Sequence, residues 1–284
     1  MHAFALPPEN ACATCRGEGV RIAAVGERAQ AELCACQSAC ARCEGTGRVY
    51  QDRDGYQFLV ACDCQKIRQG VALFNGARLP ARSADQTFES LAPQFEVQRS
   101  AAMMAQGMCH TFVPGQTREG LLISGPVGTG KTHLLASVLR YLTLEVRVAC
   151  RYVEISFLYS EIRKGFGEGK SALDIIAPLS EVPVLAIDEL GKGKMSPFEQ
   201  ETMDELVSRR YNAGRPTYFA TNYRLAEKAE RAAFTRTHER LDESRAELGL
   251  RERVGERVWS RLLQMCRVVE FPPDAADFRR SFAR

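Results

Sequence analysis

The stretch from Gly120 to Leu135 restricts the fold of this chain more than any other part of the sequence. A short apolar run, Leu121 to Ile123, predicts a buried parallel strand, and apolar residues recur at helical spacing from Leu134 onward. The turn between them reads Gly-x-x-x-x-Gly-Lys-Thr, the pattern of a phosphate-binding loop. Because glycine has no side chain, the backbone N–H groups of such a loop can approach a phosphate closely. The dipole of the following helix favours the same anion.

This loop supplies candidate ligands for both a nucleotide and a metal ion. We expect the Lys131 ammonium to reach the β- and γ-phosphates and the Thr132 hydroxyl to ligate Mg²⁺. The sequence therefore predicts binding of ATP with Mg²⁺. The predicted nucleotide-binding residues of the loop are Gly125, Pro126, Val127, Gly128, Thr129, Gly130, Lys131, Thr132 and His133.

Composition excludes several classes of protein. The 284 residues carry a net charge of only +3, so bulk charge does not indicate a nucleic-acid binder. No apolar run approaches the ~18 residues of a membrane span. The N-terminal residues 1–8 lack both the basic start and the long apolar core of a secretory signal. We therefore expect a cytoplasmic protein with no membrane association.

Cysteine is concentrated near the N-terminus. In a chain with no export signal, 11 cysteines indicate metal binding rather than disulfides. Three of them, Cys109, Cys150 and Cys266, have apolar neighbours and are expected to be small core residues. The predicted metal ligands are the others: Cys12, Cys15, Cys34, Cys36, Cys40, Cys43, Cys62 and Cys64.

These eight ligands form an internal repeat of residues 12–36 and 40–64, in which every cysteine recurs 28 residues later. Each unit has a C-x-x-C-x-G-x-G knuckle and a C-x-C pair, whose four thiolates can close a tetrahedral Zn²⁺ site. The strict period favours one ion within each unit, about two zinc ions per chain. Interleaved pairing, with the C-x-C of the first unit and the knuckle of the second around one ion, stays open. So do redox sensing and an iron–sulfur cluster, whereas a site closed by four sulfurs argues against zinc catalysis.

The knuckle resembles the cysteine-rich module of DnaJ-type co-chaperones, although here it alternates with C-x-C. Within the second unit, residues 48–51 and 56–61 are predicted strands around a turn at Asp54-Gly55. Each unit is thus expected to be a small zinc ribbon.

Three regions follow from these patterns. Residues 1–66 form the predicted zinc module, 67–90 a linker near the adenine, and 91–284 the nucleotide-binding domain. We predict helices over 65–76 and 101–109, and extended chain after Pro80, which ends the first helix.

Further strands of the predicted sheet end in polar side chains. The run from Val182 ends at Asp188 and Glu189, a Walker B pattern in which the first carboxylate holds Mg²⁺ and the second orients the attacking water. The run 217–221 ends at Asn222, whose amide can bond the γ-phosphate or the water. The run 145–154 is expected to hold another strand, followed by a helix over 155–163 that a glycine-rich turn at 165–169 ends.

Five motifs occur in one order: GPVGTGKTHL, IDELGK at 187–192, DELVSRRYN at 204–212, ATNY at 220–223 and ERVWSRL at 256–262. Together they resemble the DnaC/IstB group of AAA+ ATPases, which comprises bacterial replicative-helicase loaders and transposition helpers. The likeness runs from about Leu79 to the C-terminus. It implies an α/β fold, an αβα sandwich with a five-stranded parallel sheet. It also implies ATP hydrolysis, and ring or spiral assembly with ATP at subunit interfaces.

The resemblance also implies roles by position. Arg261 matches an arginine finger for the neighbouring subunit's γ-phosphate, with Arg257 as its nearest rival. Arg279 matches a sensor-2 arginine, although the segment after Arg261 is too short for the usual lid domain.

Residues 191–197 lie where the related initiators insert a channel-lining helix, so Lys192 and Lys194 are candidates to contact single-stranded DNA. Arg209 and Arg210 are expected to face a neighbouring subunit or DNA. The charged stretch 225–253 is expected to be a solvated helix.

Three functions remain open at this point. The first is a helicase loader whose zinc module binds a replicative helicase while the ATPase assembles on single-stranded DNA. The second is a transposition helper whose client is a transposase. The third is a nucleotide-gated adaptor in which the zinc ribbons bind a client and hydrolysis times its release. A zinc-dependent thiol oxidoreductase is a weaker fourth option.

Overall fold

The computed structural model describes residues 12–37, 40, 42–91, 93, 95–225, 248–273 and 275. Arg279 and most of the charged stretch 225–253 lie outside these residues, so the expectations for them are not addressed by the structure. Within the described ranges, no helix combines the length and the apolar composition that crossing a membrane requires.

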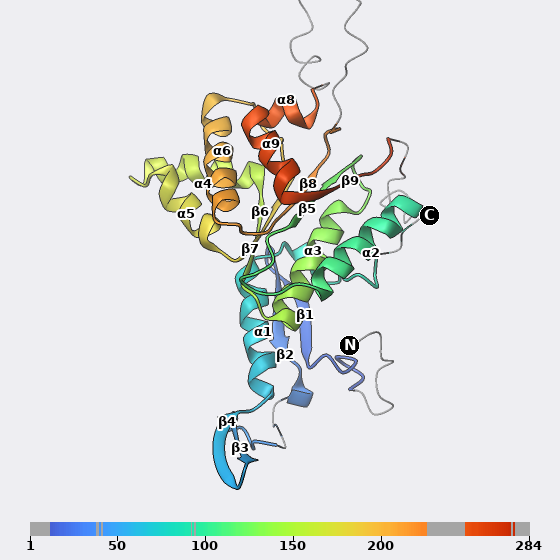
Figure 1. Ribbon diagram of the computed structural model, residues 1–284, viewed down its shortest axis with the longest axis vertical. Coiled ribbons are helices and arrows are strands. Elements are labelled where there is room, and N and C mark those ends of the chain that lie inside the picture. The colour runs from blue at the N-terminus through green and yellow to red at the C-terminus, as the bar shows by residue number, and fades with distance from the viewer. Residues whose placement is uncertain are drawn as a thin grey trace, which may run out of the picture.

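A five-stranded parallel sheet forms the centre of the chain (Figure 1). The order across the sheet is β6-β7-β8-β5-β9, and every neighbouring pair is parallel. The strands are β5 (Gly120–Ser124), β6 (Cys150–Glu154), β7 (Val184–Asp188), β8 (Thr217–Thr221) and β9 (Cys266–Glu270). β5, β7 and β8 are buried at every position, because helices cover both faces of the sheet.

Each face of the sheet has its own core. One core joins Leu121 and Ile123 to helices α1 (Cys64–Ala77), α2 (Glu96–His110) and α3 (Lys131–Tyr141). The other joins Leu122 to helices on the opposite face, and Figure 1 shows the two groups on either side of the sheet. These helices are α4 (Ile155–Gly167), α5 (Ala172–Glu181), α6 (Pro197–Asn212), α8 (Leu250–Val254) and α9 (Glu256–Met265). The αβα sandwich predicted from the sequence is confirmed.

Several local expectations need correction. The chain after Pro80 is not extended but forms a 3₁₀ turn, η2 (Ala81–Ser83). The helix α4 continues to Gly167, through the glycine at 165 that was expected to lie in the turn. The helix α2 begins at Glu96, before the expected 101, and residues 191–196 contain no helix of their own.

The three isolated cysteines lie in the core, as predicted: Cys109, Cys150 and Cys266 are all buried. Burial in apolar surroundings raises the pKa of each of these thiols. They therefore stay protonated and unreactive at neutral pH.

Each cysteine unit contains one antiparallel hairpin, as expected for ribbons. The first pairs β1 (Val20–Val25) with β2 (Arg28–Leu33), and the second pairs β3 (Arg48–Arg53) with β4 (Tyr56–Ala61). The first hairpin packs on α1, where the Asn75 amide accepts from Ala31 N at 2.7 Å and donates to Ala31 O at 3.0 Å. The second hairpin lies at the far end of α1, away from the sheet (Figure 1), and both of its strands are largely exposed.

Arg210 faces neither a partner nor DNA, contrary to the expectation for this position. It is fully buried between α5, α6 and β8. Its guanidinium donates to the Thr217 hydroxyl at 2.7 Å and to backbone carbonyl oxygens at 2.8–2.9 Å, those of Leu179, Val182 and Pro216. These carbonyls lie at the end of α5 and before β7 and β8, so one side chain satisfies the acceptors where three elements meet. Burial lowers the pKa of Arg210 to about 9.

We predict that Arg210→Ala lowers the free energy of unfolding by about 3–5 kcal/mol, because it leaves buried carbonyl oxygens without donors and opens a cavity. The matched control is Arg209→Ala on the same helix. Arg209 is paired at the surface with Glu205, and its loss is expected to cost at most about 0.5 kcal/mol. Urea unfolding of the two variants measures the difference, and equal stabilities would contradict this role.

Candidate nucleotide site and metal centres

The phosphate-binding loop connects β5 to α3, as predicted. Gly128 and Gly130 have φ values of 82° and 90°, in the region that favours glycine. The Lys131 side chain is buried within the loop, and its ammonium donates to the carbonyl oxygens of Gly125 at 2.7 Å and Pro126 at 2.6 Å. The strand therefore leads straight into a turn that gathers the lysine, the glycines and the first turn of α3.

Thr132 and Asp188 meet at the carboxyl edge of the sheet. The Thr132 hydroxyl donates to Asp188 Oδ2 at 2.7 Å, and Asp188 Oδ1 accepts from the backbone N–H of Glu189 at 2.9 Å. A hydroxyl and a carboxylate at one position beside a phosphate loop are ligands that Mg²⁺ accepts. The two residues fit the metal that the sequence implied.

Tyr152 is part of this cluster, although no sequence motif indicates it. It lies on β6, and its hydroxyl donates to Asp188 Oδ2 at 2.8 Å. Burial, reinforced by the neighbouring Asp188 charge, raises the pKa of the Tyr152 phenol well above its usual value. The phenol thus remains a hydrogen-bond donor to the carboxylate at all physiological pH values.

Glu189 follows the end of β7 in a left-handed conformation, with φ of 56°. A non-glycine residue held there stores strain, which is common at functional sites. Its carboxylate forms a close ion pair with Lys192, whose ammonium is also 3.6 Å from Glu154. The hydrogen bond with Glu189 is the largest influence that raises the pKa of Lys192.

Of the predicted nucleotide residues, 127–133 and Asp188 line a cavity of about 430 Å³, whereas Gly125 and Pro126 are not part of its lining. Asn222, from the end of β8, lines it together with the loop and both carboxylates. Several residues that the sequence did not single out also line it, from the segment before α2: Arg82, Gln86, Ser90 and Leu91.

His133 fixes that segment to α3. Its Nε2 lies 2.8 Å from the Thr87 carbonyl oxygen and 3.2 Å from the Ser90 hydroxyl. Burial lowers the pKa of His133, although the hydrogen bond with Thr87 O opposes the shift. The imidazole is therefore neutral at pH 7, with Nε2–H donating to Thr87.

Arg261 and Arg257 lie on α9 and share one carboxylate. Asp204 Oδ1 is 2.6 Å from Arg261 Nη1, and Asp204 Oδ2 is 3.5 Å from Arg257 Nη1. Neither arginine lines the cavity of its own chain. Both arginines are therefore outside the nucleotide cavity formed by the phosphate loop of the same chain.

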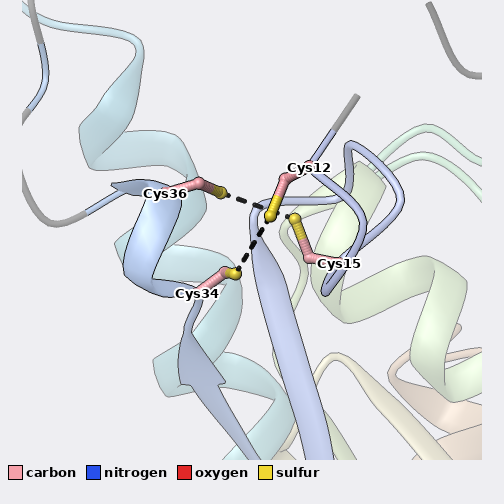
Figure 2. A group of neighbouring side chains, drawn as sticks. All are labelled: Cys12, Cys15, Cys34 and Cys36. Atoms are coloured by element: carbon pink, nitrogen blue, oxygen red, sulfur yellow. Dashed lines mark hydrogen bonds between the residues drawn. The ribbon is translucent and has the colours of Figure 1, made fainter. Parts of the chain in front are cut away.

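The eight predicted metal ligands form two groups, each within one unit of the repeat: Cys12, Cys15, Cys34 and Cys36, and Cys40, Cys43, Cys62 and Cys64. All sulfurs of a group lie within 4.8 Å of one another, and Figure 2 shows those of the first group pointing toward a common centre. The interleaved pairing is not formed.

The sulfur distances fit zinc. Cys12 and Cys34 are 3.8 Å apart, Cys15 and Cys36 3.5 Å, and the corresponding pairs of the second unit 3.7 and 3.6 Å. A tetrahedron with Zn–S bonds of ~2.3 Å has edges of about 3.8 Å. The backbone N–H groups of Gly19 and Gly47, the last glycines of the two knuckles, each donate to a knuckle sulfur at 3.3 Å. These N–H groups would stabilise thiolate charge on a bound ion.

Residues 48–231 match the family described as IstB-like ATP binding protein. The chain belongs to this family. The matched range includes the phosphate loop, both carboxylates and Asn222, and it begins at the first residue of β3. The family relation and the fold together confirm the resemblance to DnaC/IstB-type AAA+ ATPases.

Curated relatives agree with this assignment. The chain is 28% identical over 155 residues to the replicative helicase loader DnaC of Escherichia coli K12, covering 54% of this chain and 62% of that protein. It is 27% identical over 138 residues to DnaC of Buchnera aphidicola subsp. Baizongia pistaciae, covering 48% and 55%. The chain thus spans less than two thirds of these relatives.

Solved structures share the fold. A crystal structure of the DnaC helicase loader superimposes with a TM-score of 0.55 at 24% identity, over 67% of this chain and 99% of the other. The structure of DnaI superimposes with a TM-score of 0.50 at 18% identity, over 69% and 93%.

We predict that the purified protein holds two zinc ions per chain and that Cys15→Ser holds one, because each four-cysteine group closes its own site. Elemental analysis of the intact protein measures the ratio. Cys109→Ala, which removes a buried cysteine outside both groups, is expected to keep both ions. A protein purified without chelators that contains no zinc would contradict the assignment.

Proposed function

We propose that this protein binds ATP with Mg²⁺ in the cavity at the edge of the sheet and hydrolyses it. The observation that carries the proposal is the contact between Thr132 and Asp188, because it brings two separate metal-ligand motifs together beside the phosphate loop. In this proposal Lys131 binds the β- and γ-phosphates and Glu189 orients the attacking water. Asn222 senses the γ-phosphate.

The opposite side of the ATP site belongs, in this proposal, to a neighbouring subunit of a ring or spiral. Arg261 would exchange Asp204 for the neighbour's γ-phosphate, where a planar guanidinium suits several phosphate oxygens. Arg257, more exposed and more loosely paired with Asp204, remains its rival. Arg279 remains a proposed sensor-2 residue, with the lid absent or minimal.

We further propose that the protein is a DnaC-like loader of a replicative helicase that works on single-stranded DNA. The likeness to proteins named replicative helicase loaders supports this reading. An IstB-like transposition helper and a nucleotide-gated adaptor are the alternatives.

Lys192 and Lys194 remain the residues that we propose contact DNA. For Lys192, this contact requires that its ion pair with Glu189 be broken. The division into 1–66, 67–90 and 91–284 is also part of the proposal, although α1 crosses its first boundary.

We propose that the second unit of the zinc module contacts the helicase. The two hairpins correspond at a spacing of 28 residues, so the cross-strand pair Tyr50–Leu59 takes the place of Ile22–Ala31. In the first hairpin this pair faces the protein: Ala31 is buried against α1, and Ile22 packs on the core. In the second hairpin, Tyr50 is 72% and Leu59 50% exposed. At this pair the second unit therefore carries larger side chains than the first, and they are uncovered.

The net charge of the β3–β4 hairpin favours a protein client over a nucleic acid. The β3–β4 hairpin carries Arg48 and Arg53 but also Asp52 and Asp54, so it has no net charge. A surface that binds a phosphate backbone is expected to be basic. A helix on the surface of the helicase fits the face of the Tyr50–Leu59 pair better, because the equivalent face of the first unit packs on the helix α1.

The nucleotide proposal predicts different defects for two variants. Lys131→Ala is expected to lose ATP binding, because it removes the cation of the phosphate loop. Glu189→Gln is expected to bind ATP as the wild type does but to hydrolyse it at least about 100-fold more slowly, because the amide cannot polarise water. Fluorescent-nucleotide titration and phosphate release measure the two properties. Normal turnover by Glu189→Gln would refute the assigned role.

The client proposal predicts that replacing Tyr50 and Leu59 together by Ser weakens binding to the replicative helicase from the same organism by at least about tenfold. The matched control is the pair Tyr56 and Phe58, exposed on the same hairpin but at positions whose equivalents, Arg28 and Gln30, belong to the exposed edge of the first unit. Affinity is measured with Glu189→Gln and ATP, and zinc content verifies folding. Unchanged affinity would contradict the surface, and binding to a transposase instead would favour the alternative.

A further inference from the structure

Arg82 reaches the nucleotide cavity from outside the recognised motifs. It lies in η2, between α1 and α2, and lines the same cavity as Lys131 and Asp188. Its Nη2 is 4.0 Å from Asp188 Oδ2, and 54% of the side chain is exposed. A cation from outside the phosphate loop therefore lines the cavity near Asp188.

The neighbours of Arg82 indicate which part of a nucleotide it would meet. Asp188 also bonds Thr132, and these two residues would hold the Mg²⁺ that accompanies the outer phosphates of a triphosphate. A guanidinium offers several donors in one plane, which suits phosphate oxygens better than a single carboxylate oxygen at 4.0 Å. Arg82 is thus placed toward the terminal phosphate.

The tip of the first zinc hairpin holds η2 from one side. Backbone hydrogen bonds run from Ala29 N to Leu79 O and from Ala81 N to Glu27 O, each 3.0 Å long. Arg28 forms an isolated antiparallel bridge with Pro80, and its guanidinium donates to Arg78 O at 2.8 Å. The residues immediately before Arg82 are therefore tied to the turn between β1 and β2.

The metal end of the same unit is tied to the phosphate-loop helix. Glu18, in the first cysteine knuckle, is 2.8 Å from Arg140 of α3. Arg140 also donates to Ala84 O at 3.4 Å, two residues after Arg82. The hairpin tip thus contacts the chain before Arg82 directly, and the knuckle is linked to the chain after it through Arg140.

The second unit has not kept these contacts. Thr46 stands where the first unit has Glu18, and Tyr56 where it has Arg28. Tyr56 is exposed. The repeat therefore provides an internal comparison: within the described residues, the first unit contacts the segment that carries Arg82, and the second carries different residues at the positions that make these contacts.

We propose that Arg82 binds the terminal phosphate of the nucleotide and that the first zinc unit holds Arg82 in place, so that this unit is a structural part of the ATP site. The inference rests on the proposed ATP binding. It assigns to the first unit a role separate from the client contact of the second.

The first test measures equilibrium affinity for fluorescent ATP and ADP analogues with the intact protein. Arg82→Ala is expected to weaken ATP binding about tenfold and ADP binding by no more than about twofold, since it removes a charge-assisted contact to the phosphate that ADP lacks. Arg82→Lys is expected to lie between, and Arg99→Ala, a surface arginine paired with Glu96, to bind as the wild type does. Unchanged ATP affinity, or equal losses for ATP and ADP, would overturn the assignment. Wild type that fails to bind ATP would instead overturn the proposed function.

The second test uses the repeat as its own control. Cys15→Ser, which opens the first metal site, is expected to weaken ATP binding by several-fold, and Cys43→Ser, at the same position of the second unit, to leave it unchanged. Zinc analysis verifies that each variant loses one ion. Arg28→Ala, which leaves both metal sites intact, is expected to show a smaller loss in the same direction. Equal ATP affinities of wild type, Cys15→Ser and Arg28→Ala would overturn the role of the first unit.

Discussion

The carboxylate of Asp188 is the point on which the arrangement of the site depends. It is buried at the end of β7 and accepts hydrogen bonds from Thr132 on α3 and Tyr152 on β6, while Arg82 approaches from η2. A buried carboxylate is costly unless such donors surround it. Four separate parts of the chain, β7, α3, β6 and η2, therefore have to be correctly placed before the charge of Asp188 is stabilised. This requirement couples the phosphate loop to the centre of the sheet.

The two cysteine units show how one design serves two surroundings. The sulfur–sulfur distances in their metal groups are nearly equal, and their hairpins have the same register. They differ in what the strands carry: alanines in the first unit allow close packing on α1, whereas the larger side chains of Tyr50 and Leu59 in the second are exposed. A metal-closed ribbon tolerates this divergence because the ion, and not a large core, supplies much of its folding energy.

The sequence was sufficient to predict those elements and site residues that short local motifs specify. The phosphate loop and the strand ending at Asp188 follow from short spacings, and the structure places both as expected. The 28-residue repeat favoured one metal group within each unit but left the interleaved pairing open, and the structure gathers the sulfurs within the units. Tyr152, Arg82 and Arg210 were missed or misassigned because their roles depend on residues distant in the chain. Arg210 illustrates the difficulty, since it neighbours the exposed Arg209 on one helix and only the packing of α5 against α6 shows that it points inward. Likewise, no local pattern indicates that Lys192 pairs with Glu189 and Glu154.

The helix α1 connects the second zinc hairpin to the sheet, and its attachment has a mechanical consequence. Its 14 residues form a rod about 21 Å long at 1.5 Å per residue. The rod is fastened along its length: Arg147 donates to Lys66 O at 3.2 Å, and Arg151, the neighbour of Tyr152 on β6, donates to Gly76 O at 2.9 Å. Because both ends are held, the helix cannot tilt freely about its base. The second metal group, to which Cys64 at the start of α1 belongs, is therefore held at a set distance from the strand that carries Tyr152.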